Sequence, residues 1–208
     1  NHALDHHPEL LLVECAVNDN KMPMKEVRET MEGIVRKTWK ANPLTDICFI
    51  YTFANENLKD LQKGLFPPSV SAMEAVARHY EIPGIHMGLT AVDEISKGKM
   101  LILGKRDETY KVPLFSYDGV HPLPETGHRL YTEVLTRNLG KTSSNVTTTK
   151  HRLSPPLEPQ NWEQAGMHDL ENVKLIGNWN VTDSVTKGKE YYSLLPKVYV
   201  TTDTNAVI

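Results

Sequence analysis

Cysteine is scarce in this chain, and membrane-length apolar runs and strongly basic segments are missing. The 208 residues include two cysteines, Cys15 and Cys48, which both fall in apolar runs and are therefore expected to be free buried thiols rather than a disulfide. The net charge is -3, and no Lys/Arg-dense run alternates with aromatic residues, so a nucleic-acid-binding surface is not expected. No apolar run approaches the roughly 18 to 20 residues that span a bilayer, so we expect no membrane span.

Patterns typical of strands and helices alternate between residues 10 and 140. Leu10–Val17 is an apolar run with a single charge, typical of a buried parallel strand, and Met24–Lys40 has the apolar spacing of an amphipathic helix. The same reading predicts strands at 46–53 and 84–88, and helices at 69–80, capped by Ser69, and at 124–139. This alternation predicts an α/β domain over residues 1–140, with a parallel sheet covered on both faces.

The pattern changes after residue 140. Residues 141–160 are rich in Ser, Thr and Pro and are interpreted as a linker. Strand-like runs follow at Val173–Trp179 and Tyr191–Val200, so residues 161–208 are predicted to form a β-rich accessory unit with Trp179 buried. Its other aromatic residues, Trp162 among them, are expected in the core of that unit. Two or three strands cannot close a sandwich, so we expect this unit to be incomplete.

Asn18 follows the first predicted strand directly. In a parallel sheet, ligands bind outside the carboxyl ends of the strands, so the carboxamide of Asn18 could face a bound substrate. A carboxamide N–H is a neutral, fixed donor suited to a developing oxyanion. The alternative interpretation is that Asn18-Asp19-Asn20 only forms the turn into the following helix.

Asp118 and His121 lie three positions apart in a turn-rich segment before the last predicted helix. A carboxylate can hold an imidazole in one tautomer, and the imidazole can then act as general base and general acid. The alternative is again structural, with Asp118-Gly119 as a turn and His121 at the entry to a helix. Both this pair and Asn18 are predicted on strand-exit loops of one sheet, and their chemistry is complementary.

The same residues resemble a known family. Leu11-Leu-Val-Glu-Cys-Ala-Val-Asn-Asp19 is similar to the third conserved block of the SGNH, or GDSL-type, hydrolases, with Ala16 in place of the usual glycine. Asp118-Gly-Val-His121-Pro, followed by Gly127-His128-Arg-Leu-Tyr131, resembles the fifth block. The resemblance implies a three-layer, flavodoxin-like fold and a serine esterase. It also implies that Asn18 is an oxyanion donor, His121 the base and acid, and Asp118 its partner.

The first two blocks of that family have no counterpart in this sequence. They contain the nucleophilic serine and a glycine and precede the third block, whereas only residues 1–9 precede Leu10 here. Ser69, Ser71 and Ser116 do not stand in the required Gly-Asp-Ser context and are rejected as nucleophiles. The resemblance therefore implies that the first strands are missing and that the serine comes from an upstream segment of the same protein or from a second chain.

Three functions follow from these observations. The first is an ester hydrolase that removes acyl groups, with acetyl as the expected acyl group, from a carbohydrate, because a β-rich unit follows the domain and the sequence has no long apolar segment of the kind that forms a lipase lid. The second is a catalytically silent module that binds a glycan or a protein. The third is a structural fragment of a larger enzyme. A carbohydrate or small-molecule ester is the expected partner, with no cofactor and no metal, and the resemblance favours a secreted or periplasmic protein.

Overall fold

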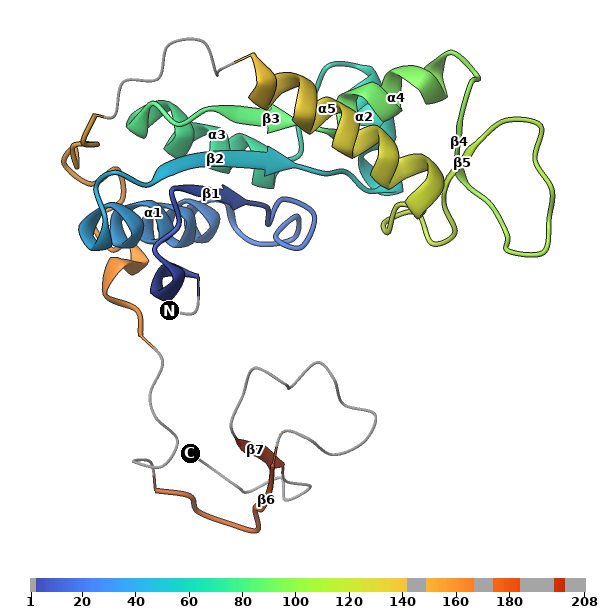
Figure 1. Cartoon of the computed structure of the whole chain (residues 1–208). Helices are drawn as coiled ribbons and strands as arrows, with labels where there is room; N and C mark the ends of the chain where they lie inside the picture. Colours follow the sequence, from blue (N-terminus) through green and yellow to red (C-terminus); the bar gives the residue numbers. More distant parts are fainter. Residues whose placement is uncertain (1–2, 142–148, 167–173, 184–196, 201–208) are drawn as a thin grey trace. The chain divides into compact units, whose positions relative to one another are not determined.

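A computed structural model of the chain describes residues 3–141, 149–166, 174–183 and 197–200 (Figure 1). The chain divides into two compact units, Asn1–Ala165 and Gly166–Ile208. Within the described residues, no helix is both long and apolar enough to cross a membrane.

The first unit is built around a parallel sheet with the strand order β1-β2-β3. The strands are β1 (Leu10–Val13), β2 (Asp46–Tyr51) and β3 (Gly84–His86), and every pairing between them is parallel. Parallel neighbours need a crossover, and each crossover contains helices. These are α1 (Met24–Ala41) between β1 and β2, then α2 (Leu58–Gln62) and α3 (Pro68–Tyr80) between β2 and β3.

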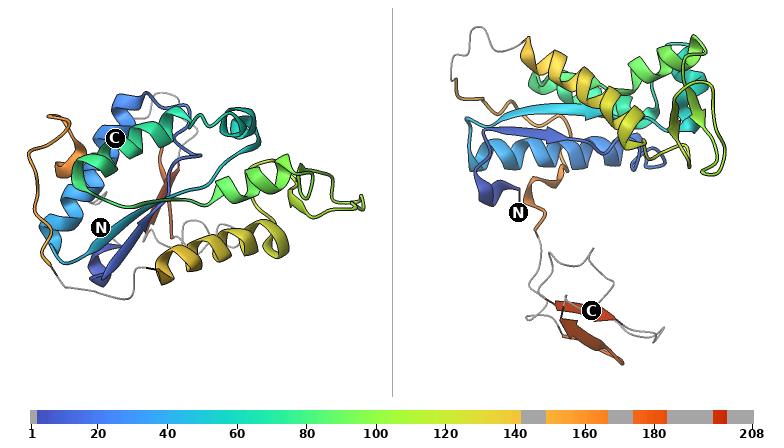
Figure 2. Two further views of the ribbon diagram at one scale, coloured as in Figure 1. Left: turned by 90° about the horizontal axis from the view of Figure 1, so that it is seen from above. Right: turned by 45° about the vertical axis from the view of Figure 1, so that its right-hand side comes forward.

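Helices α1 and α3 cover one face of this sheet (Figure 2, left). Because successive side chains of a strand point to opposite faces, Val13, Phe49 and Tyr51 all lie on this face. The apolar stripe of α1 packs against them and repeats at helical spacing, which explains why this segment folds as an amphipathic helix. Its buried members are Val27, Met31, Val35 and Trp39.

Helices α4 (Gly88–Ser96) and α5 (Arg129–Gly140) pack against the opposite face, where Ile50 and Ile85 lie. One π-helical turn, Pro124–His128, leads into α5. Strands β4 (Leu101–Leu103) and β5 (Leu114–Ser116) form a second, two-stranded parallel sheet. The predicted α/β class with parallel strands and helices on both faces is confirmed.

The strand ends differ from the sequence-based prediction. β1 stops at Val13 rather than Val17, because the chain turns there and the Asp19 N–H donates to the Cys15 carbonyl at 2.9 Å. Cys15 is therefore half-buried, although both cysteines are free as expected. Ser69 does not cap α3, which begins at Pro68. The short elements α4, β4 and β5 were not predicted.

Residues 149–165 belong to the first unit and pack against α1, although 141–160 were expected to be a linker. The buried carboxylate of Glu32 on α1 accepts the N–H groups of Leu157 and Glu158 at 2.6 and 2.7 Å. Arg36, also on α1, forms an ion pair with Glu163 at 2.6 Å. These contacts give the Pro-rich segment hydrogen-bond partners that its composition does not reveal. Residues 142–148 lie outside the described ranges.

In the second unit, the described strands form one antiparallel pair, β6 (Asn180–Asp183) with β7 (Lys197–Val200). The strand predicted at Val173–Trp179 is wrong for residues 174–179, because the strand starts at Asn180. Trp179 is half-buried rather than buried, and its indole N–H donates to the Ile176 carbonyl at 3.1 Å. Trp162 belongs to the first unit and is 52% exposed, so it is not a core residue. Residues 191–196 of the other predicted strand lie outside the described ranges, and the β-rich unit stays a prediction.

Candidate active site

The loop after β5 holds Asp118 as the hub of its own turn. Asp118 Oδ1 accepts the backbone N–H groups of Val120 and His121 at 2.9 and 2.8 Å. Gly119 adopts a φ of 82°, a left-handed conformation that favours glycine, and a Cβ there would lie 2.9 Å from the Cβ of Asn55. The sequence Asp-Gly-Val-His therefore forms a tight turn in which the carboxylate organises the backbone.

The second oxygen of this carboxylate holds the imidazole of His121. Asp118 Oδ2 lies 2.7 Å from His121 Nδ1. This contact, followed by the two backbone N–H bonds and the Ser116 hydroxyl, holds the pKa of Asp118 well below its usual range. With Nδ1 bonded to the carboxylate, Nε2 is the ring nitrogen left to face a substrate. The His121 side chain is 85% exposed, so that nitrogen is accessible.

Ser116 lies two residues before Asp118 and is fully buried. Its hydroxyl donates to Asp118 Oδ1 at 2.9 Å and accepts the N–H groups of Asp118 and Gly119 at 3.2 and 2.9 Å. The hydroxyl thus points at the carboxylate and the turn rather than at the ring of His121. This geometry makes Ser116 a support for Asp118, a role that the sequence comparison with Gly-Asp-Ser did not suggest.

Asn18 lies in the turn that follows β1. The buried Ser69 hydroxyl on α3 donates to the Ala16 carbonyl at 2.7 Å and so ties this turn to the helix. Asn18 itself is exposed, and its carboxamide makes no hydrogen bond with the part of the chain that the structure describes. It is therefore available to a ligand, as the prediction of an oxyanion donor requires.

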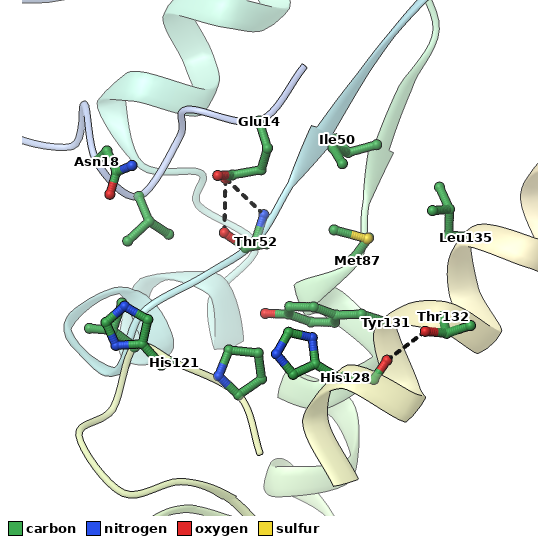
Figure 3. A pocket seen from close by; sticks show the side chains of 13 residues that line it. Glu14, Asn18, Ile50, Thr52, Met87, His121, His128, Tyr131, Thr132 and Leu135 are labelled. Carbon is green, nitrogen blue, oxygen red and sulfur yellow. Dashed lines mark hydrogen bonds between the residues drawn. The ribbon is translucent and has the colours of Figure 1, made fainter. Parts of the chain in front are cut away.

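A cavity of about 450 Å³ brings Asn18 and His121 together at one end (Figure 3). Asn18 comes from the β1 turn and His121 from the β5 loop, so the structure places these predicted residues at one edge of the sheet. A second cavity, which Asn18 lines together with Asp118, adjoins it. Serines are absent from the described linings of both cavities.

Several residues that line the first cavity were not predicted as part of a site. Glu14 Oε1 accepts the Thr52 hydroxyl at 2.8 Å, which links the turn after β1 to the end of β2 (Figure 3). Tyr131 is buried, and this burial raises the pKa of its hydroxyl. His128 also lines the cavity. The only sequence signal for Glu14 was that it is the single charge in an apolar run.

A search of protein families finds no match to this sequence, and no curated protein matches it either. Among solved structures, the chain is similar to a two-domain esterase active on acetylated mannans, crystallised with mannopentaose. The TM-score is 0.63 at 22% sequence identity, over 83% of this chain. This chain has an esterase-like fold. It spans only 40% of the length of that esterase.

The described ranges contain no group of three or more His, Cys, Asp or Glu side chains that could hold a metal ion. His79 and His86 lie away from the candidate site. His79 Nε2 is 2.8 Å from the Pro155 carbonyl, and His86 packs between Tyr51 and Phe66. Among the histidines that the structure describes, His121 combines exposure, a carboxylate partner and a lining position in the cavity.

Proposed function

We propose that this chain is the acid–base and oxyanion half of a serine ester hydrolase of the SGNH type. The observation that supports this most is the 2.7 Å contact between Asp118 and His121, which lie beside Asn18 at the strand ends of an esterase-like fold. The Asp118 carboxylate holds Nδ1 in the protonated tautomer, so that Nε2 has a lone pair for a substrate hydroxyl or a serine.

In this mechanism, His121 Nε2 takes the proton of a serine hydroxyl as the serine oxygen attacks the ester carbonyl. The carbonyl oxygen becomes an anion, which the Asn18 carboxamide N–H stabilises. His121 then gives its proton to the departing alcohol, and an acyl-serine remains. Water attacks this acyl-serine in the same way, with His121 as base, and releases the carboxylic acid and the free serine.

The serine is proposed to come from a polypeptide segment other than these 208 residues. Ser116 already serves Asp118, and no serine lines the described part of either cavity. β1 lies at the end of the sheet order, and Leu10 and Leu12 on one of its faces are 43% and 36% exposed. An apolar strand at a sheet edge is a surface that another strand or helix normally covers, which is where a serine-bearing segment would pack.

The substrate is proposed to be an acylated carbohydrate, with acetyl as the acyl group. The support is the structural neighbour, an esterase active on acetylated mannans, together with a cavity whose lining combines polar and apolar side chains. A catalytically silent binding module with the same residues is the alternative that the following experiment excludes or establishes.

The test is hydrolysis of an aryl acetate and of acetylated mannan by the complete natural protein. Replacing the base, His121→Ala, is expected to lower kcat by about 1,000-fold or more on both substrates. His79→Ala is the matched control, because His79 contacts Pro155 rather than the cavity, and it is expected to retain wild-type rates. Absence of hydrolysis by the wild-type protein, or full activity in His121→Ala, would contradict the proposed function.

A further inference from the structure

Two further cavities adjoin the cavity at His121 along the strand ends of the first unit. The first and second cavities share Val17, Asn18 and Val120, and the second has a volume of about 520 Å³. The second and third share Asn20 and Glu56, and the third has a volume of about 560 Å³. Because neighbouring cavities share lining residues, the three lie side by side, and together they are called here the strand-end groove. It extends from His121 to Phe66, which lies just before α3.

The middle of the strand-end groove is polar, and hydrogen bonds between loops hold its wall in place. Asn20 Nδ2 donates to Glu56 Oε1 at 2.8 Å and so joins the turn after β1 to the loop after β2. The Asn55 N–H donates to the Gly119 carbonyl at 2.7 Å, which ties the Glu56 loop to the loop of Asp118 and His121. These contacts fix the spacing between the groove wall and His121. The second carboxylate oxygen of Glu56 remains for a hydroxyl donor, with which a carboxylate forms short, strong hydrogen bonds.

The far end of the groove presents an aromatic ring. Phe66 lines the third cavity and is 47% exposed, although it is a large apolar residue. Its ring stacks on the imidazole of His86, with centroids 5.4 Å apart and planes 22° from parallel. Pro67 follows, and a residue before proline is restricted to extended backbone conformations, which limits the backbone of Phe66. One face of the ring thus stacks on His86, while the side chain stays partly exposed and lines the third cavity.

A flat, preorganised aromatic face beside carboxylate and amide groups suits a pyranose. The axial C–H groups of a sugar ring carry partial positive charge and pack on the negative face of an aromatic ring, while its hydroxyls bond to the polar wall. The charged residues along the groove are mostly acidic, since Lys21 is the cation of its described lining against four carboxylates. The carboxylates are Glu14, Glu56, Asp60 and Asp118. An acidic polymer would be repelled by this field.

We propose that the strand-end groove binds the main chain of a neutral polysaccharide, with Phe66 as a stacking platform and Asn20 and Glu56 as the polar wall. This inference rests on the proposed function and deepens it, because it makes the substrate a polymer whose ester is presented to His121 while neighbouring sugars occupy the groove. A groove that joins three cavities is longer than a single acetylated sugar needs.

Calorimetric titration of the complete protein with mannopentaose, an uncharged pentasaccharide without an ester, tests this directly. The variant Phe66→Ala is expected to bind about 10-fold more weakly, because the stacking face is removed. Glu56→Gln changes an exposed carboxylate of the polar wall and keeps an acceptor oxygen for Asn20, so it keeps the test valid if Phe66→Ala does not fold, and it is expected to weaken binding a few-fold. A galacturonate pentasaccharide is expected to bind at least about 10-fold more weakly than mannopentaose.

Trp162→Ala is the matched control, since Trp162 is an equally exposed aromatic residue that lines none of the three cavities. It is expected to bind mannopentaose as the wild type does. The proposal is overturned by unchanged affinity in both groove variants, by an equal loss in Trp162→Ala, or by preference for the acidic oligosaccharide. Because this titration involves no hydrolysis, its failure is distinguishable from failure of the aryl acetate assay, which tests the proposed function without the groove.

Discussion

Single side chains in this protein do more than one task at the candidate site. The Asp118 carboxylate caps its own turn with one oxygen and holds His121 with the other. Ser116 also has two roles, because its one buried hydroxyl forms hydrogen bonds with both the Asp118 carboxylate and the backbone of the turn. The turn geometry and the orientation of His121 therefore depend on the same few atoms, so structure and proposed chemistry cannot be altered separately here.

His86 gives a pH prediction at the residue scale. Both of its ring nitrogens are shielded from solvent, and burial lowers its pKa from 6.5 to about 4. Between those pH values the unfolded chain binds a proton that the folded chain does not, so the free energy of unfolding falls as the pH drops from 6.5 to about 4. The loss at the acid end is on the order of 3 kcal/mol.

Urea unfolding at pH 7.5 and at pH 4 measures this loss. His86→Gln is expected to lose less stability between the two conditions than the wild type, because it has no proton to gain. The same substitution at the exposed His6 controls for replacing a histidine as such. Equal pH dependence in His86→Gln and the wild type would show that His86 is not the group responsible.

At the scale of elements, α3 positions the turn of Asn18. Ser69→Ala removes the donor to the Ala16 carbonyl and leaves that acceptor without its partner in a buried position. The free energy of unfolding is expected to fall by about 1 to 3 kcal/mol, as measured by urea denaturation. Ser71→Ala on the same helix is the control, since the Ser71 hydroxyl makes no hydrogen bond with the described residues, and its effect should stay within about 0.5 kcal/mol. Equal effects of the two substitutions would contradict this role of Ser69.

The sequence predicts long, strongly periodic elements better than short ones. The apolar spacing of α1 located the helix to within one residue at its end, and Asp46–Tyr51 lies inside the predicted strand. The run Leu10–Val17 predicts one strand, although the strand ends at Val13, because apolarity alone does not distinguish a strand from a half-buried turn. The strands β4 and β5 are too short for a periodic signal.

At the candidate site, too, some residues could be predicted from the sequence and others could not. Asn18, Asp118 and His121 were found from motif chemistry, and the fold places them at one edge of the sheet. Ser116 and Glu14 act through hydrogen bonds to particular neighbours, Asp118 and Thr52, and residue type alone does not reveal such contacts. The packing of residues 149–165 depends on Glu32 and Arg36, which lie over a hundred positions earlier in the chain.

At the scale of the whole molecule, the central claim is that the nucleophile lies outside these 208 residues. A fluorophosphonate probe that modifies activated serines, applied to the complete natural protein and followed by peptide mass spectrometry, identifies the nucleophile directly. We predict one labelled serine outside Asn1–Ile208, with labelling lost in His121→Ala. Labelling of Ser116, or of any other serine within Asn1–Ile208, would contradict this account.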